Sequence, residues 1–78
     1  MKVICKVNRG YNFTEGKTYD LVEFIPRLVT DHFTFPRYVV VVDDNGKTAQ
    51  AHAYRFDMLD GQSCEEYMAK TFKDEKAS

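Results

Sequence analysis

The sequence lacks the features that mark several large classes of protein. It contains no apolar run close to the roughly 20 residues that a membrane-spanning helix needs. It has no Gly-rich phosphate-binding loop, and no positively charged segment followed by an apolar one opens the chain. We therefore expect a cytoplasmic protein with no membrane segment and no phosphate loop.

Cysteine is also scarce. The two cysteines, Cys5 and Cys64, are far apart in the chain and form no CxxC pair. Because disulfides are rare in reducing compartments, we expect free thiols, with a Cys5–Cys64 disulfide as the alternative. Neither residue is favoured as a nucleophile, since Cys5 lies on an apolar face and the carboxylates of Glu65 and Glu66 oppose a Cys64 thiolate.

An excess of charge of either sign is absent. The formal net charge is −1, divided between +2 for residues 1–42 and −3 for residues 43–78. This asymmetry falls well short of the basic field on which non-specific nucleic-acid binding depends. Strong binding of DNA or RNA is therefore disfavoured, although a local basic patch is compatible with the count.

What the chain does contain is typical of one small globular domain. Its 78 residues are 44% hydrophobic and include five tyrosines and six phenylalanines. A chain of this length buries only roughly 60 to 65% of its unfolded surface, so the core must be small. Bulky aromatic side chains are well suited to fill such a core.

Alternating hydrophobicity predicts two strands in the first third of the chain. Val3, Cys5 and Val7 alternate with Lys2, Ile4 and Lys6, so one face is apolar and the other mostly charged, and residues 18–25 show a half-buried strand pattern. In the second segment one face is predicted to carry Tyr19, Leu21, Glu23 and Ile25, and the other to carry Thr18, Asp20, Val22 and Phe24. Pro26 ends regular pairing, and residues 26–36 predict a long loop or an irregular edge.

Residues 37–56 predict a tight antiparallel hairpin, because a run of valines leads into Asn45-Gly46 and an alternating segment follows. A type I′ turn at Asn45-Gly46 pairs Val42 with Ala49, Val40 with Ala51 and Tyr38 with Ala53. That face is the expected core, and Val39 and Val41 are expected on the opposite face. The alanines leave space for the large aromatic residues Phe13, Tyr19 and Phe56.

The last third predicts a short turn or 3₁₀ segment at 54–56, a closing strand at 57–59 and a helix. Ser63 and Glu66 form a capping box, and helical spacing continues through Cys64, Tyr67, Met68, Thr71 and Phe72. The predicted organisation is mainly β: a small antiparallel barrel of about five strands at 1–62, a C-terminal α-helix at 63–73 that packs on or beside it, and a flexible tail at 74–78.

Three stretches resemble a pattern found in small phage-encoded proteins. They are T-x-G-K-x-Y within FTEGKTYDLVEF, the Asp-Asp-Asn-Gly that ends RYVVVVDDNG, and the Arg-Phe of YRFDML. The resemblance covers roughly residues 1–59 and implies an SH3-like β-barrel, in a family largely without assigned function. Its motifs are mostly structural, and the 26–36 segment and the helix after Ser63 depart from the pattern.

Candidate chemistry is sparse. His32 and His52 do not stand at a metal-ligand spacing with either cysteine or with nearby acids, and His52 falls on the outward face of its strand. Asp43 and Asp44 are typical of a hairpin entry and not of a general acid and base. We expect no metal, no cofactor and no enzymatic activity.

Aromatic and arginine side chains on loops are the remaining candidates, because such residues dominate protein interfaces. The candidates are Tyr11, Phe13, Phe33, Phe35 and Tyr54 among the aromatics, and Arg9, Arg37 and Arg55 among the arginines. Some of them, Phe13 above all, can equally belong to the core. Phe33 and Phe35 share one side of the segment before Pro36 and are the expected exposed pair.

The leading hypothesis is a non-enzymatic binding module, a phage accessory protein that binds and modulates a host protein in the host cytoplasm through residues 26–36 and a neighbouring barrel edge. The first alternative is a small nucleic-acid-binding barrel that uses Lys2, Lys6, Arg9 and Arg37, with stacking on Tyr11 or Phe35. The second is a structural homo-oligomer, a homodimer for example, held by the helix stripe or by a strand edge.

Overall fold

The chain folds into two small sheets and one helix. The structure is a computed structural model. It describes residues 1–7, 12–72 and 75–76, the last two by their backbone only. The elements are β1 (Lys2–Cys5), β2 (Thr18–Ile25), β3 (Leu28–Val29), β4 (Thr34–Phe35), β5 (Tyr38–Val42), β6 (Thr48–His52), the 3₁₀ segment η1 (Ala53–Arg55), β7 (Phe56–Met58), α1 (Cys64–Thr71) and β8 (Glu75–Lys76).

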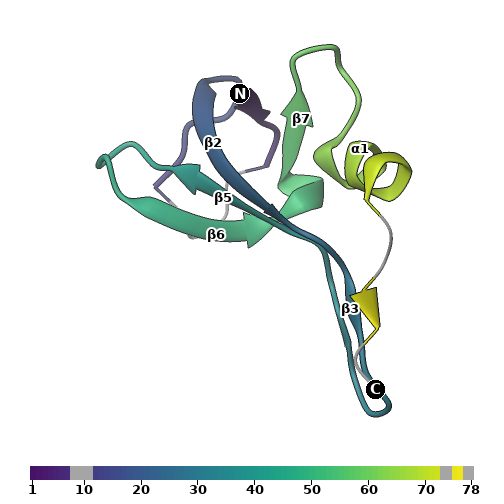
Figure 1. Cartoon of the computed structure of the whole chain (residues 1–78). Helices are drawn as coiled ribbons and strands as arrows, with labels where there is room; N and C mark the ends of the chain where they lie inside the picture. The colour runs from purple at the N-terminus through teal and green to yellow at the C-terminus, as the bar shows by residue number, and fades with distance from the viewer. Residues whose placement is uncertain (8–11, 73–74, 77–78) are drawn as a thin grey trace.

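The larger sheet has five antiparallel strands in the order β6-β5-β2-β1-β7. Its two edge strands are consecutive in the chain, because only the three residues of η1 separate β6 from β7. A flat sheet would hold these edges about 19 Å apart, whereas a 3₁₀ segment of this length spans roughly 6–8 Å. The sheet is therefore strongly curled (Figure 1), and the predicted mainly β fold with a C-terminal helix is confirmed.

The predicted register of the β5–β6 hairpin is wrong by one residue. Gly46 N–H donates to the Asp43 carbonyl at 3.0 Å, and Gly46 has a φ of +78°. Asn45 does not have the positive φ that a type I′ turn needs, so Asp44, Asn45 and Gly46 form a three-residue loop instead.

The longer loop changes which residues of β5 face the core. Val41 now pairs with Ala49 and Val39 with Ala51, so the two valines predicted to point outward are fully buried. The expected core residues Tyr38, Val40 and Val42 lie on the outer face. The prediction for β6 was right, because the side chain of Ala51 is buried.

The predicted faces of β2 are also wrong beyond Leu21, because the strand contains a β-bulge. Leu21 pairs with Val41 and Glu23 with Val40, so Val22 is an extra residue without a partner on β5. Beyond the bulge the alternation is reversed, and Phe24 packs against the core while Val22 is exposed. The sequence pattern had placed these two residues together on one face.

The core lies inside the curled sheet. Phe13, Tyr19 and Phe56 are buried as predicted, and the ring of Phe13 makes edge-on contacts with the other two at 4.9 and 5.1 Å. Edge-to-face pairs of this kind add to the stabilisation that burial provides. The remaining buried members are Val3, Cys5, Val39, Val41, Ala51, Ala53, Met58, Cys64 and Met68.

Helix α1 lies beside β7 and η1 (Figure 1). The Ser63 hydroxyl accepts a hydrogen bond from Glu66 N–H at 3.1 Å, which caps the helix as predicted. Met68 is fully buried in the core, and Tyr67 packs its ring against that of Phe24 at 5.4 Å. Docking of this face explains why so short a helix is ordered.

Residues 26–36 form a projecting hairpin, which we call the arm, where the sequence predicted a long loop or irregular edge. β3 and β4 pair antiparallel, and the Phe33 carbonyl accepts a hydrogen bond from Thr30 N–H at 2.7 Å to close the turn. The arm extends away from the larger sheet (Figure 1), in a molecule that measures 38 × 24 × 19 Å.

Two residues on each strand separate the β3–β4 ladder of the arm from the larger sheet: Pro26 and Arg27 on one strand, Pro36 and Arg37 on the other. Proline has no N–H for a ladder, which explains the interruption. Within the predicted tail, Glu75–Lys76 forms β8, which pairs parallel with β3, and the other tail residues lie outside the described part of the chain.

Replacement of Gly46 by Ala should lower the free energy of unfolding by about 1–2 kcal/mol, because an L-residue is strained in the left-handed region. No atom lies within 4 Å of a β-carbon built at this position, so the effect should come from the backbone alone. Urea denaturation would measure it. Gly46→Asn is the matched control and should be less destabilising, since Asn tolerates this conformation.

Candidate functional site

Exposed hydrophobic side chains indicate where the described surface can bind another molecule. The large ones are Met1, Val22, Phe33, Phe35, Tyr54 and Leu59. Phe33 and Phe35 are neighbours, with ring centroids 6.2 Å apart. They are the one ring–ring pair among the described contacts in which both partners are exposed.

The arm presents these two rings on a short, open strand. Phe33 is 67% exposed and Phe35 46% exposed, and every residue from 31 to 36 is exposed. Phe33 and Phe35 stand two positions apart at the start of an extended strand, so their side chains share one face. The prediction that this pair is exposed is confirmed.

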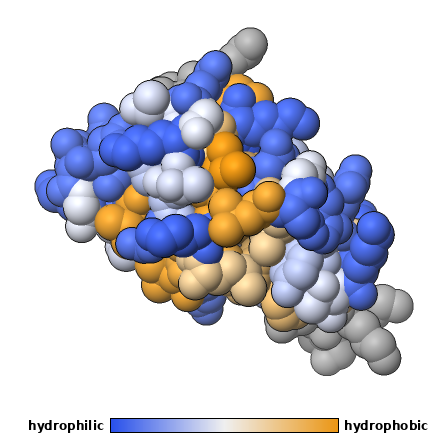
Figure 2. Space-filling model, turned by 90° about the horizontal axis from the view of Figure 1, so that it is seen from above, coloured by the Kyte–Doolittle hydropathy of each residue, from blue (hydrophilic) through white to orange (hydrophobic). Residues whose placement is uncertain are grey.

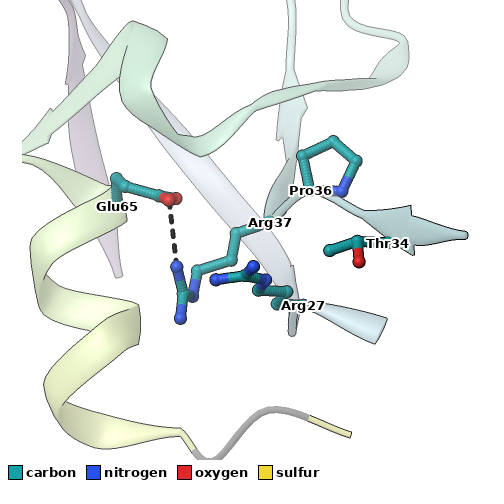
Figure 3. Close-up of a pocket in the computed structure, with 5 residues that line it drawn as sticks. All are labelled: Arg27, Thr34, Pro36, Arg37 and Glu65. Carbon is teal, nitrogen blue, oxygen red and sulfur yellow. Dashed lines mark hydrogen bonds and ion pairs between the residues drawn. The ribbon is translucent and has the colours of Figure 1, made fainter. Parts of the chain in front are cut away.

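A pocket of about 230 Å³ lies at the base of the arm, between the arm and the start of α1. It is lined by Arg27, Thr34, Pro36, Arg37 and Glu65 (Figure 3). An Arg37 guanidinium nitrogen lies 3.0 Å from a Glu65 carboxylate oxygen, and the Arg37 side chain is only 12% exposed. Arg37, a predicted anchor for a partner, thus joins the arm to the helix.

Tyr54, another predicted contact residue, belongs to a different cluster on the outer face of the larger sheet. The rings of Tyr38 and His52 lie 5.0 Å apart, and those of His52 and Tyr54 lie 5.2 Å apart. Tyr54 is half-exposed and forms the outer end of this aromatic column. The sequence predicted a solvated His52, whereas its ring is partly buried between two tyrosines.

A second hollow, of about 320 Å³, lies beside the N-terminus and the end of β7. Met1, Lys2, Met58, Leu59, Asp60 and Tyr67 line it. Figure 2 views the molecule from this end and shows hydrophobic surface in the middle of a largely hydrophilic face. The hollow is apolar but carries no convergent set of polar groups.

The residues of the T-x-G-K-x-Y motif converge on Asp44. Its carboxylate accepts hydrogen bonds from the Thr14 hydroxyl at 3.1 Å and from the Tyr19 hydroxyl at 2.9 Å, and it forms an ion pair with Lys17 at 2.9 Å. Asp44 N–H also donates to the Asn12 carbonyl at 2.8 Å. The motif thus ties the β5–β6 turn to the segment before β2.

This cluster was not visible as a unit in the sequence. The sequence predicts that Asp43 and Asp44 are both turn residues, but of the two only the Asp43 side chain accepts hydrogen bonds within the turn, from the N–H groups of Asn45 and Lys47. Lys17 and Tyr19 lower the pKa of the Asp44 carboxyl, chiefly through their hydrogen bonds to it. No pattern in the single sequence connects Asp44 with Thr14, Lys17 and Tyr19.

The two thiols are free and buried. Burial raises the pKa of Cys64 to about 12 and also raises the pKa of Cys5. Cys64 lies against the Met58 sulfur at 3.7 Å, within the core. These surroundings oppose the thiolate that nucleophilic chemistry requires.

Two negative findings apply to the described residues. In that part of the chain, no three side chains from His, Cys, Asp and Glu are grouped as a metal site requires. None of the helices found there has the length and apolar character needed to cross a bilayer. The predicted contact residues Arg9 and Tyr11 lie outside the described residues.

The structure therefore divides the predicted binding residues among separate places. Phe33 and Phe35 are together on the arm, Arg37 is at its base, and Tyr54 is in the aromatic column. Phe13, for which the sequence left both a contact role and a core role open, is buried in the core. No protein-family model matches the chain, and no curated protein or solved structure shows significant similarity to it.

The Asp44 contacts predict an acid-sensitive stability. Because the folded-state pKa of Asp44 lies below its ordinary value of 3.8, its stabilising contribution is complete above that pH and disappears as the pH falls through the folded-state pKa. Asp44→Asn should flatten this part of the stability profile, measured by urea denaturation at a series of pH values. Asp20→Asn, which removes only an exposed pair with Lys2, should leave the Asp44 contribution in place.

Burial of both thiols predicts slow modification of the folded protein at neutral pH. A thiol reagent such as Ellman's reagent should react with neither Cys5 nor Cys64 in native buffer and with both in urea. The absorbance of the released chromophore gives the number of thiols that have reacted. Rapid reaction of one thiol in the native protein would show that its surroundings are open.

Proposed function

We propose that this chain is a non-enzymatic protein-binding module whose docking surface is the arm. The observation that carries the proposal is the exposed pair Phe33 and Phe35 on a hairpin that projects from the body. Exposed aromatic side chains that cluster on a monomer surface are typical of interaction sites. The pair offers a partner apolar area without requiring any part of the core to unfold.

The contacts of the arm support a role in binding more than a role in stabilising the fold. Its two rings contact each other and are not covered by the body, so they add little to the stability of the larger sheet. The Arg37–Glu65 ion pair holds the base of the arm against α1. An element that is fixed at its base and exposed at its tip can bind a partner without first becoming ordered, which lowers the entropic cost of binding.

We further propose that the larger sheet is a small SH3-like barrel, the fold that the resemblance to phage-encoded proteins implies. Its strong curl and the η1 link between its two edge strands support this assignment. The Asp44 cluster supports it too, because it gives the shared T-x-G-K-x-Y motif a structural role. Within this proposal the chain is a phage accessory protein that acts on a host protein in the host cytoplasm.

The described residues favour nucleic-acid binding less. Lys2 is paired with Asp20 at 2.7 Å and Arg37 with Glu65, so two of the four cations proposed for that role already face carboxylates. The net charge of −1 adds no attraction for a phosphate backbone. Protein binding by the arm is therefore the function that the geometry supports best.

Replacement of both Phe33 and Phe35 by Ala should abolish capture of a partner from bacterial lysate by the immobilised chain. The loss should exceed about tenfold, since buried aromatic anchors at an interface contribute more than about 1.4 kcal/mol each. Mass spectrometry of the retained proteins, compared between the wild type and the variant, is the measurement.

The double variant Val22→Ala with Leu59→Ala is the matched control, because it removes two equally exposed hydrophobic side chains elsewhere. It should retain the same partner. Equal capture by all three proteins, or loss only in the control, would show that the arm is not the docking surface. Circular dichroism would verify that each variant is folded.

A further inference from the structure

The outer edge of β4 is an open strand edge. In the smaller sheet the order is β4-β3-β8, so β3 is paired on both sides while β4 is paired on one. All residues from 31 to 36 are exposed, and no other part of the described chain covers this edge. An uncovered edge is a template on which a further strand can pair.

The hydrogen-bond pattern of the arm identifies Thr34 as the residue that presents its backbone to this edge. Thr30 N–H donates to the Phe33 carbonyl, which makes these two residues a hydrogen-bonded pair. The neighbouring pair, Val29 with Thr34, is then of the non-hydrogen-bonded kind. The N–H and C=O of Thr34 consequently point away from β3, and none of the hydrogen bonds among the described residues uses them.

We propose that the arm is a self-association element: β4 pairs antiparallel with β4 of a second copy of the chain, with Thr34 opposite Thr34 on a two-fold axis. In this register each Thr34 N–H donates to the Thr34 carbonyl of the other copy. The two three-stranded sheets join into one sheet of six strands. The interface is isologous, so it closes at the dimer.

The same register brings the four exposed rings together. With Thr34 on the axis, Phe33 of each copy lies directly opposite Phe35 of the other. Residues directly opposite in an antiparallel pair have β-carbons about 4.5–5.5 Å apart, and aromatic cross-strand pairs stabilise a sheet. Because Phe33 and Phe35 share one face within a copy, the four rings form one cluster.

Charge complementarity supports the same arrangement. The antiparallel direction carries the turn of one arm, with its exposed Asp31, toward the base of the other arm. That base holds the pocket lined by Arg27 and Arg37. A carboxylate of one copy therefore approaches two guanidinium groups of the other.

In this register Pro36 lies opposite His32, in the turn of the other arm, so the missing N–H of the proline falls at the end of the new ladder. A shift of two residues along β4 would place Pro36 opposite Thr34, and the Thr34 carbonyl would then face a residue without an N–H. Such a shift would also separate Phe33 from Phe35 of the other copy. The register centred on Thr34 therefore pairs the backbone groups of Thr34 and brings the rings and the opposite charges together.

The size of the contact predicts a weak, reversible dimer. Aromatic side chains bury about 150–250 Å² each when fully covered, and the two rings of one copy are only partly exposed, so the interface stays well below the roughly 1,200 Å² of stable complexes. Association should therefore depend on concentration in the micromolar to millimolar range. A binding partner of the arm and a second copy would compete for the same rings.

Cysteine cross-linking tests the register directly. Paired residues of this kind have α-carbons about 5.5 Å apart, within the range that a disulfide spans. Thr34→Cys should form a disulfide-linked dimer under copper-catalysed air oxidation, detected by non-reducing electrophoresis. Thr48→Cys, an exposed threonine on the edge strand β6, is the matched control and should cross-link about tenfold more slowly. The native thiols are buried.

Sedimentation velocity of the unmodified chain over the same concentration range completes the test. The average mass should rise with concentration, and Phe33→Ala with Phe35→Ala should reduce association more than about tenfold. A chain that stays monomeric, or equal cross-linking at positions 34 and 48, would overturn the proposal. A monomeric chain that still captures a lysate protein through its rings would overturn only this inference and leave the protein-binding function intact.

Discussion

The arrangement of the core depends on the side-chain alternation of two strands, and two one-residue irregularities set that alternation. The extra residue Val22 reverses the pattern within β2 so that Phe24 joins the core, and the three-residue loop ending at Gly46 places Val39 and Val41 inside. Without either one, a strand would present polar or outer residues to Phe56 and Met68. The contact of Phe24 with Tyr67 of α1 and the outer position of the aromatic column follow from these two features.

This dependence explains which parts of the fold sequence reasoning could reach. The bounds of β2, the capped helix and the buried alanine face of β6 follow from local patterns, and the structure has them. The inner face of β5 could not be obtained in the same way, because it depends on the φ of Asn45, and Asn-Gly is compatible with more than one turn. The bulge at Val22 has no local signature, since an alternating segment looks the same with or without it.

The arm and the Asp44 cluster show two further limits. Pro26 and Pro36 indicated an interruption, and the sequence could not distinguish a loop from a hairpin that resumes beyond each proline. Exposure of Phe33 and Phe35 was nevertheless predictable, because no periodic pattern connected them to the core. The contact of Asp44 with Thr14, Lys17 and Tyr19 joins residues 25 to 30 positions apart, and a single sequence carries no record of such distances.

The interruption at the prolines also has a mechanical consequence. Between the two ladders the paired strands cross a short stretch without ladder pairs, at Pro26–Arg27 and Pro36–Arg37. The ion pair between Arg37 and Glu65 joins this stretch to α1. Because Glu65 belongs to the first turn of α1, a displacement of the arm relative to the larger sheet would disturb a contact of the helix.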